Sequence, residues 1–451
     1  MTNCLVVGAG MRGIVAAVML RKAGHDVILL DGGDLPGGIL CSKEWDGLYL
    51  DKGCHLLDFA DAKSGRLFQE ILGDAIHPVE RRYASINRGL KSDGIAVPDM
   101  SLFPVKERTR AVHEIRAQAR ETETQCNTLG EKLVRHFGET AGNYVSNCVR
   151  RISMHDPGEL APEAFETLRL VHRVRLGPDN EMEDLKSDPV LNERLAVASQ
   201  TDPLRFYRHE TPFTHRNYYP SRKGMHGFCE VVADYLRTVG VELRLTSRLN
   251  ELLVCSSKVK AIVETGDKIE ADLCYWSLPT SLFLRTIGVD DPLASYSRPV
   301  SMLLYYFRLR PEFVSDYTYI HDFTPERLCF RASAPGVYGR QTDRDGNTYV
   351  CAEIPVRAGT ELWHTPEKET ERIWEEMKDM DMVHRNGCFT AFRVEKLPVA
   401  FVLAGRGWGS AKSVHDSALA TYKGSVLFGN SDTFGKTAII NAVESDLAEL
   451  I

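Results

Sequence analysis

Three features are absent from the sequence, and each absence excludes a class of protein. No apolar run approaches the roughly 18 residues that span a bilayer, so we expect no integral membrane segment. The 11 cysteines form no CxxC pair and no metal-ligand spacing, which argues against a disulfide framework and a metal site. The formal net charge is −7, so there is no overall basic field and nucleic acid is not an expected partner.

The cysteines and the first residues also bear on location. Scattered cysteines are typical of reduced thiols in a cytosol, and the chain enters an apolar strand at Leu5 without a signal-peptide pattern. We therefore expect a cytoplasmic protein. With 43% hydrophobic and 26% charged residues among 451, the chain has the composition of a globular protein of about two to four domain-sized units.

The most informative motif lies in the first 55 residues. A short apolar strand over 5–7 leads into a glycine-rich turn, a helix over 14–23 and a second strand over 27–30. In such a βαβ unit, glycines allow close approach of a diphosphate, and the helix N-terminus supplies N–H groups to it. The turn residues expected to bind the diphosphate are Gly8, Gly10, Met11, Arg12 and Gly13. Asp31, which ends the second strand, is expected to bind a ribose.

Three further glycines follow at short spacing. Gly37 and Gly38 come soon after Asp31, and Gly53 lies in the turn Asp51-Lys52-Gly53-Cys54-His55. Glycine lets a backbone pass close to a flat ligand, because a Cβ would collide with it. With its motifs in this order, the chain resembles a flavoprotein superfamily that includes flavin amine oxidases, protoporphyrinogen oxidase, phytoene desaturases and UDP-galactopyranose mutase. The resemblance implies that the cofactor is FAD rather than NAD.

The same resemblance extends to the middle and the end of the chain. The segment from Tyr218 to Gly227 is similar to a glycine turn of that family, with Lys223 where a first glycine is common. The family pattern also places Leu249 near the adenine. It implies flavin contacts from the end of the last strand and the start of the last helix, at Gly429, Asn430, Thr437, Ala438 and Ile439. No cysteine lies near this last motif, so we expect noncovalent FAD.

The resemblance implies an α/β fold with a discontinuous, Rossmann-like FAD-binding domain and an inserted, mixed α+β substrate domain. The FAD-binding domain is expected in three pieces: 1–75, 215–290 and 400–451. The substrate domain takes the remaining segments, with a helical cap and loop in 76–214 and a sheet in 291–399. Strands are expected over 302–307, 317–320, 328–332 and 349–353, the last of which completes that sheet. The active site is expected between the two domains.

Two residues are candidates for a catalytic role, each with an alternative. Arg331 sits on an otherwise apolar strand, and a buried guanidinium needs anionic or carbonyl partners. It either faces a substrate, as in the sugar-processing relatives of the family, or pairs with a core carboxylate. His55 either contacts the flavin or transfers a proton there, or it caps a buried loop.

Three functional hypotheses remain for the chain. The first is an FAD-dependent oxidoreductase that transfers a hydride from a small organic substrate, such as a metabolite related to a sugar or a nucleotide sugar, to flavin N5. The second is a non-redox isomerase like UDP-galactopyranose mutase, whose pattern has a Gly-Arg pair in the last motif. This chain has Gly429-Asn430 there, which favours the oxidoreductase branch. The third is a flavin with a structural role only.

Overall fold

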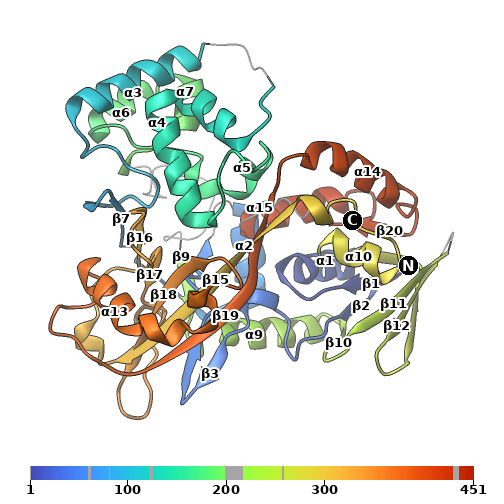
Figure 1. Cartoon of the computed structure of the whole chain (residues 1–451). Helices are drawn as coiled ribbons and strands as arrows, with labels where there is room; N and C mark the ends of the chain where they lie inside the picture. Colours follow the sequence, from blue (N-terminus) through green and yellow to red (C-terminus); the bar gives the residue numbers. More distant parts are fainter. Residues whose placement is uncertain are drawn as a thin grey trace.

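The computed structural model describes residues 2–58, 62–80, 82–120, 125–198, 217–255, 258–429 and 436–451. Within these ranges the chain forms three parts (Figure 1). A five-stranded sheet with its helices carries both ends of the chain, a seven-stranded sheet lies beside it, and a group of helices stands at the top of the view. None of the helices in the described ranges is long and apolar enough to cross a membrane.

The five-stranded sheet is parallel and draws its strands from three distant segments of the chain. Its spatial order is β10 (Glu242–Arg244), β2 (Asp26–Leu30), β1 (Asn3–Val7), β14 (Leu273–Trp276) and β20 (Val426–Phe428). Buried apolar runs such as those of β1 and β2 are typical of a parallel sheet covered on both faces. The predicted α/β class, with a discontinuous Rossmann-like domain, is confirmed.

Side chains along β1 point alternately to the two faces of this sheet, and each face is covered by different elements. Cys4 and Val6 point to one face and pack with α1 (Met11–Lys22), α9 (Gly224–Thr238) and α15 (Lys436–Asp446). Leu5 and Val7 point to the other face. There they meet the antiparallel strands β11 (Leu249–Val254), β12 (Val259–Val263) and β13 (Lys268–Ala271), together with α10 (Thr280–Thr286).

The second of the three parts is the seven-stranded sheet. Its order is β19 (Phe389–Ala404), β15 (Ser297–Leu309), β18 (Thr348–Val356), β17 (Arg331–Ser333), β16 (Tyr319–Asp322), β7 (Tyr83–Asn87) and β8 (Leu90–Asp93). One face packs against α13 (Thr370–Asp379) through Ile373, Trp374 and Met377. The expectation that the strand over 349–353 completes the sheet is wrong, because β19 extends one edge and β7 and β8 extend the other.

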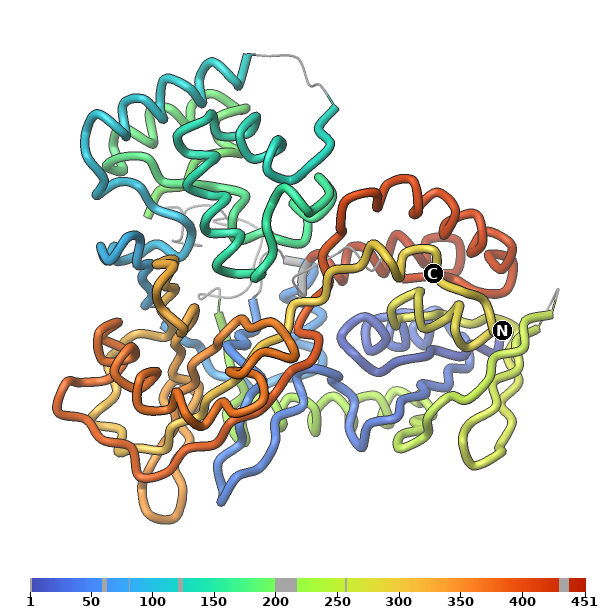
Figure 2. Tube along the Cα trace, in the orientation of Figure 1, coloured from blue at the N-terminus to red at the C-terminus, as the bar shows by residue number. Residues whose placement is uncertain are grey.

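The helical group stands over one side of this sheet and is seen as the teal and green part of the trace in Figure 2. Its longest members are α3 (Val105–Gln118) and α4 (Leu129–Ser153). Thr128 caps α4 by accepting a hydrogen bond from the Glu131 N–H at 3.2 Å, and Gly138, with φ +82°, introduces a kink. The shorter helices of the group are α5 (Ala164–Thr167), α6 (Asp179–Leu185) and α7 (Pro189–Arg194).

The other elements connect these parts. The helices are α2 (Ala62–Leu72), α11 (Pro335–Tyr338), α12 (Glu361–His364) and α14 (Trp408–Ala420). The strands are β3 (Lys43–Trp45), β4 (Leu48–Leu50), β5 (Leu57–Asp58), β6 (Ile76–Pro78) and β9 (Asn217–Pro220). The hairpin of β3 and β4 reaches the seven-stranded sheet, because Leu48 and Leu50 pack in one cluster with Leu304 of β15.

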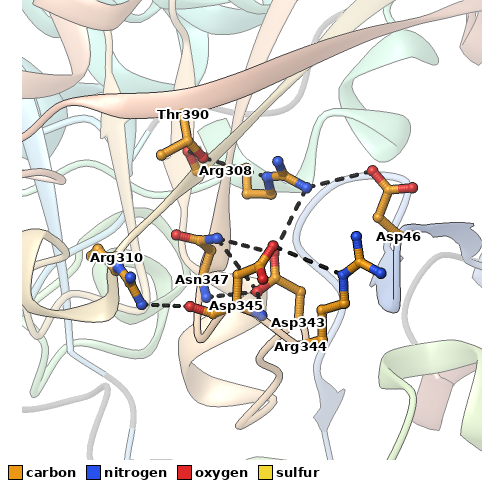
Figure 3. Close-up of polar contacts among 8 residues, drawn as sticks. All are labelled: Asp46, Arg308, Arg310, Asp343, Arg344, Asp345, Asn347 and Thr390. Atoms are coloured by element: carbon orange, nitrogen blue, oxygen red, sulfur yellow. Dashed lines mark hydrogen bonds and ion pairs between the residues drawn. The ribbon is translucent and has the colours of Figure 1, made fainter.

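A polar junction links the tip of that hairpin to the seven-stranded sheet (Figure 3). Arg308 on β15 lies between Asp46 at the hairpin tip, at 3.4 Å, and Asp343, at 3.7 Å. Asp343 in turn accepts hydrogen bonds from the backbone N–H groups of Asp345 and Asn347, at 2.9 and 2.8 Å. The Asp343 side chain is only 2% exposed, so it depends on these donors and on the Arg308 cation.

This junction generates a stability prediction. Arg308→Met removes the cation beside the buried Asp343 carboxylate and should lower the free energy of unfolding by about 1–3 kcal/mol in urea denaturation. The matched control is Arg344→Gln, since the Arg344 side chain is 90% exposed and should change stability by less than about 0.5 kcal/mol. Equal effects of the two substitutions would contradict the role given to Arg308.

Candidate functional site

The glycine-rich turn between β1 and α1 leaves room for a ligand at Gly10 and no room for a side chain at Gly13. A Cβ built on Gly13 would lie 1.8 Å from the Gly8 carbonyl oxygen, so helix and strand pack too closely for any side chain there. A Cβ on Gly10 would meet nothing within 4 Å. Gly10 is also the N-cap of α1 and provides no side-chain cap. The first turn of α1, with Met11 and Arg12, therefore presents N–H groups and the positive end of the helix dipole to open space, which fits a diphosphate.

The predicted ribose-binding residue, Asp31, braces this turn. Its two carboxylate oxygens accept hydrogen bonds from the N–H groups of Ala9, at 2.6 Å, and Gly33, at 2.7 Å. Each oxygen keeps a lone pair for a ribose hydroxyl. The Ser247 N–H donates to the Asp31 carbonyl oxygen at 2.9 Å, which brings the segment leading to Leu249 beside Asp31. Leu249 itself is half-buried at the start of β11.

The second glycine pair lies against the first turn. The Gly37 N–H donates to the Ala9 carbonyl oxygen at 2.7 Å, and a Cβ on Gly38 would lie 3.3 Å from the Gly10 Cα. Both Gly37 and Gly38 have positive φ, +141° and +60°. The structure therefore brings together two glycine motifs that are separated by about one strand and one helix in the sequence.

The last motif adjoins the same turn from the other side. A Cβ on Gly429, at the end of β20, would lie 2.3 Å from the Arg12 Cδ. Ala438 and Ile439 lie half-buried in the first turns of α15, which packs against α1. Thr437 belongs to the same helix, but its side chain lies outside the described residues, and so does Asn430.

Asp51 organises the turn that follows β4. It is completely buried, and its carboxylate accepts hydrogen bonds from Ser42 Oγ at 2.6 Å, Tyr219 OH at 2.5 Å and the Met225 N–H at 3.1 Å. Burial, followed by the Asp51 charge, holds the pKa of Tyr219 well above its usual range. Tyr219 therefore remains a hydrogen-bond donor to Asp51. One carboxylate thus joins the Asp51–His55 turn to the start of α9.

The next residues of this turn touch the seven-stranded sheet. Arg331 on β17 and Glu353 on β18 stand directly opposite each other and form a bidentate pair, with Nε–Oε1 at 2.6 Å and Nη2–Oε2 at 2.5 Å. The Glu353 Oε1 also accepts from the Cys54 N–H at 3.0 Å, and a Cβ on Gly53 would lie 3.0 Å from the same oxygen. Of the two alternatives for Arg331, the structure shows the partnership with a core carboxylate.

The Arg331 guanidinium is held in its charged form. Burial lowers the pKa of the Arg331 guanidinium, but the charge and hydrogen bonds of Glu353, together with Cys54 and Tyr319, outweigh burial and raise that pKa above its ordinary value. The Glu353 side chain is 3% exposed and that of Arg331 is 28% exposed. The net charge of the pair is zero, so it offers no uncompensated cation to a ligand.

His55 and Tyr338 complete the neighbourhood. The His55 Nε2 lies 3.1 Å from the Lys52 carbonyl oxygen, a contact that caps the turn, and His55 also has other interactions. The Tyr338 hydroxyl lies 3.8 Å from Cys54 Sγ, and its ring meets that of Tyr219 edge-on, with centroids 4.9 Å apart. No cluster of metal-ligating side chains is present in the part of the chain that the structure describes.

Sequence reasoning missed two residues of this site. The sequence predicts Asp51 only as part of a turn, because its role as a hydrogen-bonding hub depends on burial that the sequence does not show. Glu353 was read as an ordinary strand residue, although it is the only charge between Thr348 and Val356. An arginine and a glutamate, each alone on an apolar strand, are natural partners in one sheet.

Comparison with known proteins places the chain in a family. Residues 11–279 match the model of a family described as flavin containing amine oxidoreductase. A 1-hydroxycarotenoid 3,4-desaturase from a Flavobacterium species is 23% identical over 69% of this chain and 64% of its own length. An uncharacterized protein of Methanothermococcus thermolithotrophicus is 42% identical over 12% of this chain and 51% of its own length. The chain thus spans between half and two thirds of these relatives.

Solved structures share the fold over the whole chain. Reduced UDP-galactopyranose mutase has a TM-score of 0.72 at 13% identity and covers 100% of this chain and 94% of its own. A putative protoporphyrinogen oxidase from Exiguobacterium has a TM-score of 0.67 at 13% identity, covering 99% and 98%. A variant of putrescine oxidase has a TM-score of 0.64 at 14% identity, covering 100% and 98%. At these identities the likeness concerns the fold alone.

The open space at Gly10 generates a sharp prediction. Gly10 has φ −71° and ψ 179°, which any residue adopts, so Gly10→Val should fold normally. The valine side chain would fill the position of the diphosphate, and the purified variant should lose its flavin absorbance. The control is Gly424→Val, at another glycine without positive φ and with nothing within 4 Å of a built Cβ, which should keep the flavin. A yellow Gly10→Val protein would contradict the assignment.

A second prediction concerns Asp51. Asp51→Asn replaces an ionised acceptor of three hydrogen bonds by an amide with one acceptor oxygen, so some donors lose their partner. The free energy of unfolding should fall by about 2–4 kcal/mol in urea denaturation. Tyr219→Phe, which removes only one of the donors, should cost about 1–2 kcal/mol. A neutral Asp51→Asn substitution would show that the hub has no energetic role.

Proposed function

Because this chain belongs to the flavin-containing amine oxidoreductases, we propose that it is an FAD-dependent oxidoreductase that removes a hydride from an uncharged small organic substrate. Bound FAD supplies the two-electron acceptor for this chemistry. The family match and the arrangement of the glycine turns support the cofactor. The reaction type and the substrate class are our inference from the residues that surround the turn at Asp51–His55.

The cofactor-binding residues divide by the part of FAD that they would hold. The turn over 8–13 and the start of α1 would bind the diphosphate, and Asp31 would accept hydrogen bonds from the ribose. Leu249 would lie against the adenine. The first turn of α15, with Ala438 and Ile439, would direct backbone N–H groups at the flavin, where a helix N-terminus stabilises negative charge.

The observation that carries the substrate class is the neutralisation of Arg331 by Glu353. The same face of the sheet continues with Tyr319, two positions before His321, and His321 stands opposite Arg331. The Tyr319 ring stacks on that of Tyr83, with centroids 5.6 Å apart and an interplanar angle of 10°. A wall of aromatic rings and a compensated ion pair favours an uncharged substrate over a diphosphate.

Arg331 and Glu353 act in this proposal as positioning residues. Glu353 accepts a hydrogen bond from the Cys54 N–H and therefore fixes the distance between the Gly53–Cys54 turn and the sheet. His55 follows in the same turn, with Nε2 directed at a carbonyl oxygen. It is the candidate for holding or moving a proton beside the flavin, because an imidazole can both accept and donate a proton.

The mutase-like alternative has less support. That reaction requires cations that bind the pyrophosphate of a sugar nucleotide. In this chain the Nε and Nη2 atoms of Arg331 both donate to Glu353. The chain also has Gly429-Asn430 where the mutase pattern has Gly-Arg. Likeness to UDP-galactopyranose mutase concerns the fold, at 13% identity.

Anaerobic reduction of the flavin tests the reaction type. Mixing the purified holoenzyme with a panel of uncharged alcohols and unsaturated hydrocarbons should bleach the flavin absorbance with at least one class, without dithionite. A matched panel of nucleotide sugars should leave the absorbance unchanged. Turnover of a nucleotide sugar only after chemical prereduction, without net electron transfer, would replace this proposal by the isomerase.

A double-mutant cycle tests the role of Arg331. Arg331→Met alone leaves the buried Glu353 charge uncompensated and should lower the free energy of unfolding by about 3–5 kcal/mol. Arg331→Met combined with Glu353→Gln removes both charges and keeps an acceptor for the Cys54 N–H, so it should recover most of that loss. The double variant should keep its flavin, and its KM for an uncharged substrate should change little. Loss of substrate affinity in a stable double variant would place Arg331 on the substrate instead.

A further inference from the structure

Two cysteines that are 188 residues apart in sequence meet behind the second glycine pair. Cys41 directly follows a short 3-10 helix over Gly38–Leu40, and Cys229 lies in the second turn of α9. Their Sγ atoms are 3.5 Å apart. Cys229 is buried and Cys41 is only partly buried, so a small reagent from solvent reaches Cys41 first.

The thiol pair is in contact with the cofactor-binding turn. A Cβ on Gly37 would lie 2.3 Å from Cys229 Sγ and 3.1 Å from Cys41 Sγ, so both sulfur atoms pack on the backbone of this glycine. The Gly37 N–H is bonded to the Ala9 carbonyl oxygen in the diphosphate turn, at 2.7 Å. Any covalent change at the two sulfur atoms is therefore transmitted to the backbone that faces the cofactor.

We propose that Cys41 and Cys229 form a reversible disulfide when they meet a small peroxide, and that this bond locks the Gly37–Gly38 turn over bound FAD. The proposal rests on the FAD-binding part of the proposed function and is independent of the substrate. The sulfur atoms need to approach from 3.5 Å to about 2.05 Å. Cys41 is the residue that moves, because it lies outside any helix or strand and is only partly buried, whereas α9 is held in the core by Phe228 and Val232.

The chemistry balances with hydrogen peroxide as the oxidant. Cys41 attacks one peroxide oxygen as the thiolate, so that an S–O bond forms, the O–O bond breaks, and the leaving hydroxide takes a proton to become water. Cys229 then loses its proton and attacks the sulfenic sulfur of Cys41. An S–S bond forms, the S–O bond breaks, and a second water leaves. Two thiols are oxidised by two electrons, and one peroxide is reduced to two waters.

The electrostatics agree with this division of roles. The hydrogen bond with Cys229 lowers the pKa of the Cys41 thiol despite its burial, so Cys41 is the more acidic and more reactive thiol. The same contact and burial raise the pKa of Cys229, which therefore remains protonated until the second step. Cys41 is the attacking residue and Cys229 the resolving one.

The test uses the full-length holoenzyme. Treatment with hydrogen peroxide should yield a Cys41–Cys229 cross-linked peptide in mass spectrometry, and dithiothreitol should reverse it. After dilution, the oxidised protein should release FAD several-fold more slowly than the reduced protein, as followed by the fluorescence of free FAD. Cys41→Ser should abolish both effects, and Cys388→Ser, at an exposed cysteine, should leave both intact.

Two results would overturn the proposal. One is oxidation of Cys41 to sulfinic acid without the cross-link; the other is a cross-link that leaves FAD release unchanged or faster. Should Cys41→Ser fail to fold, Cys229→Ala provides the same test, because it also removes one partner of the disulfide. A protein that binds no FAD refutes the proposed function regardless of its thiols, whereas a flavoprotein without the cross-link refutes only this inference.

Discussion

The structure depends on the close contact between Gly8 and Gly13 in the turn that joins β1 to α1. Only 1.8 Å would separate a Cβ at Gly13 from the Gly8 carbonyl oxygen, so helix and strand meet without a side chain between them. This contact sets the N-terminus of α1 over the carboxyl ends of the parallel strands, where ligands of open α/β sheets bind. Gly37, Gly38 and Gly429 then pack around that one turn.

Two buried carboxylates extend this arrangement to the rest of the molecule. Asp51 joins the turn after β4 to Tyr219 and the start of α9. Glu353 joins the same turn to Arg331 on the seven-stranded sheet. Each carboxylate accepts hydrogen bonds from more than one element, which makes its position costly to change. The turn over Asp51–His55, which we expect beside the flavin, is therefore positioned by a few charge-assisted hydrogen bonds.

The sequence predicted the local part of this architecture and missed the distant part. The βαβ unit is written in neighbouring residues, with glycines between apolar runs, so its fold and its expected ligand could be inferred together. Strand β19 was missed because it is a partly exposed edge strand. Charged residues such as Arg393, Glu395 and Lys396 break up its first half, and Pro398 interrupts its apolar second half. Partnerships such as Arg331 with Glu353 and Cys41 with Cys229 depend on the register of strands and the packing of helices, which one sequence does not encode locally.

The central claim is that the opening βαβ unit binds FAD and that the flavin performs the chemistry. Native mass spectrometry of the purified protein, followed by chromatography of the molecule released by acid, tests it most directly. The account predicts one FAD for each chain, released intact because it is bound noncovalently. A chain that retains NAD or no nucleotide at all, and that cannot be reconstituted with FAD, would contradict it.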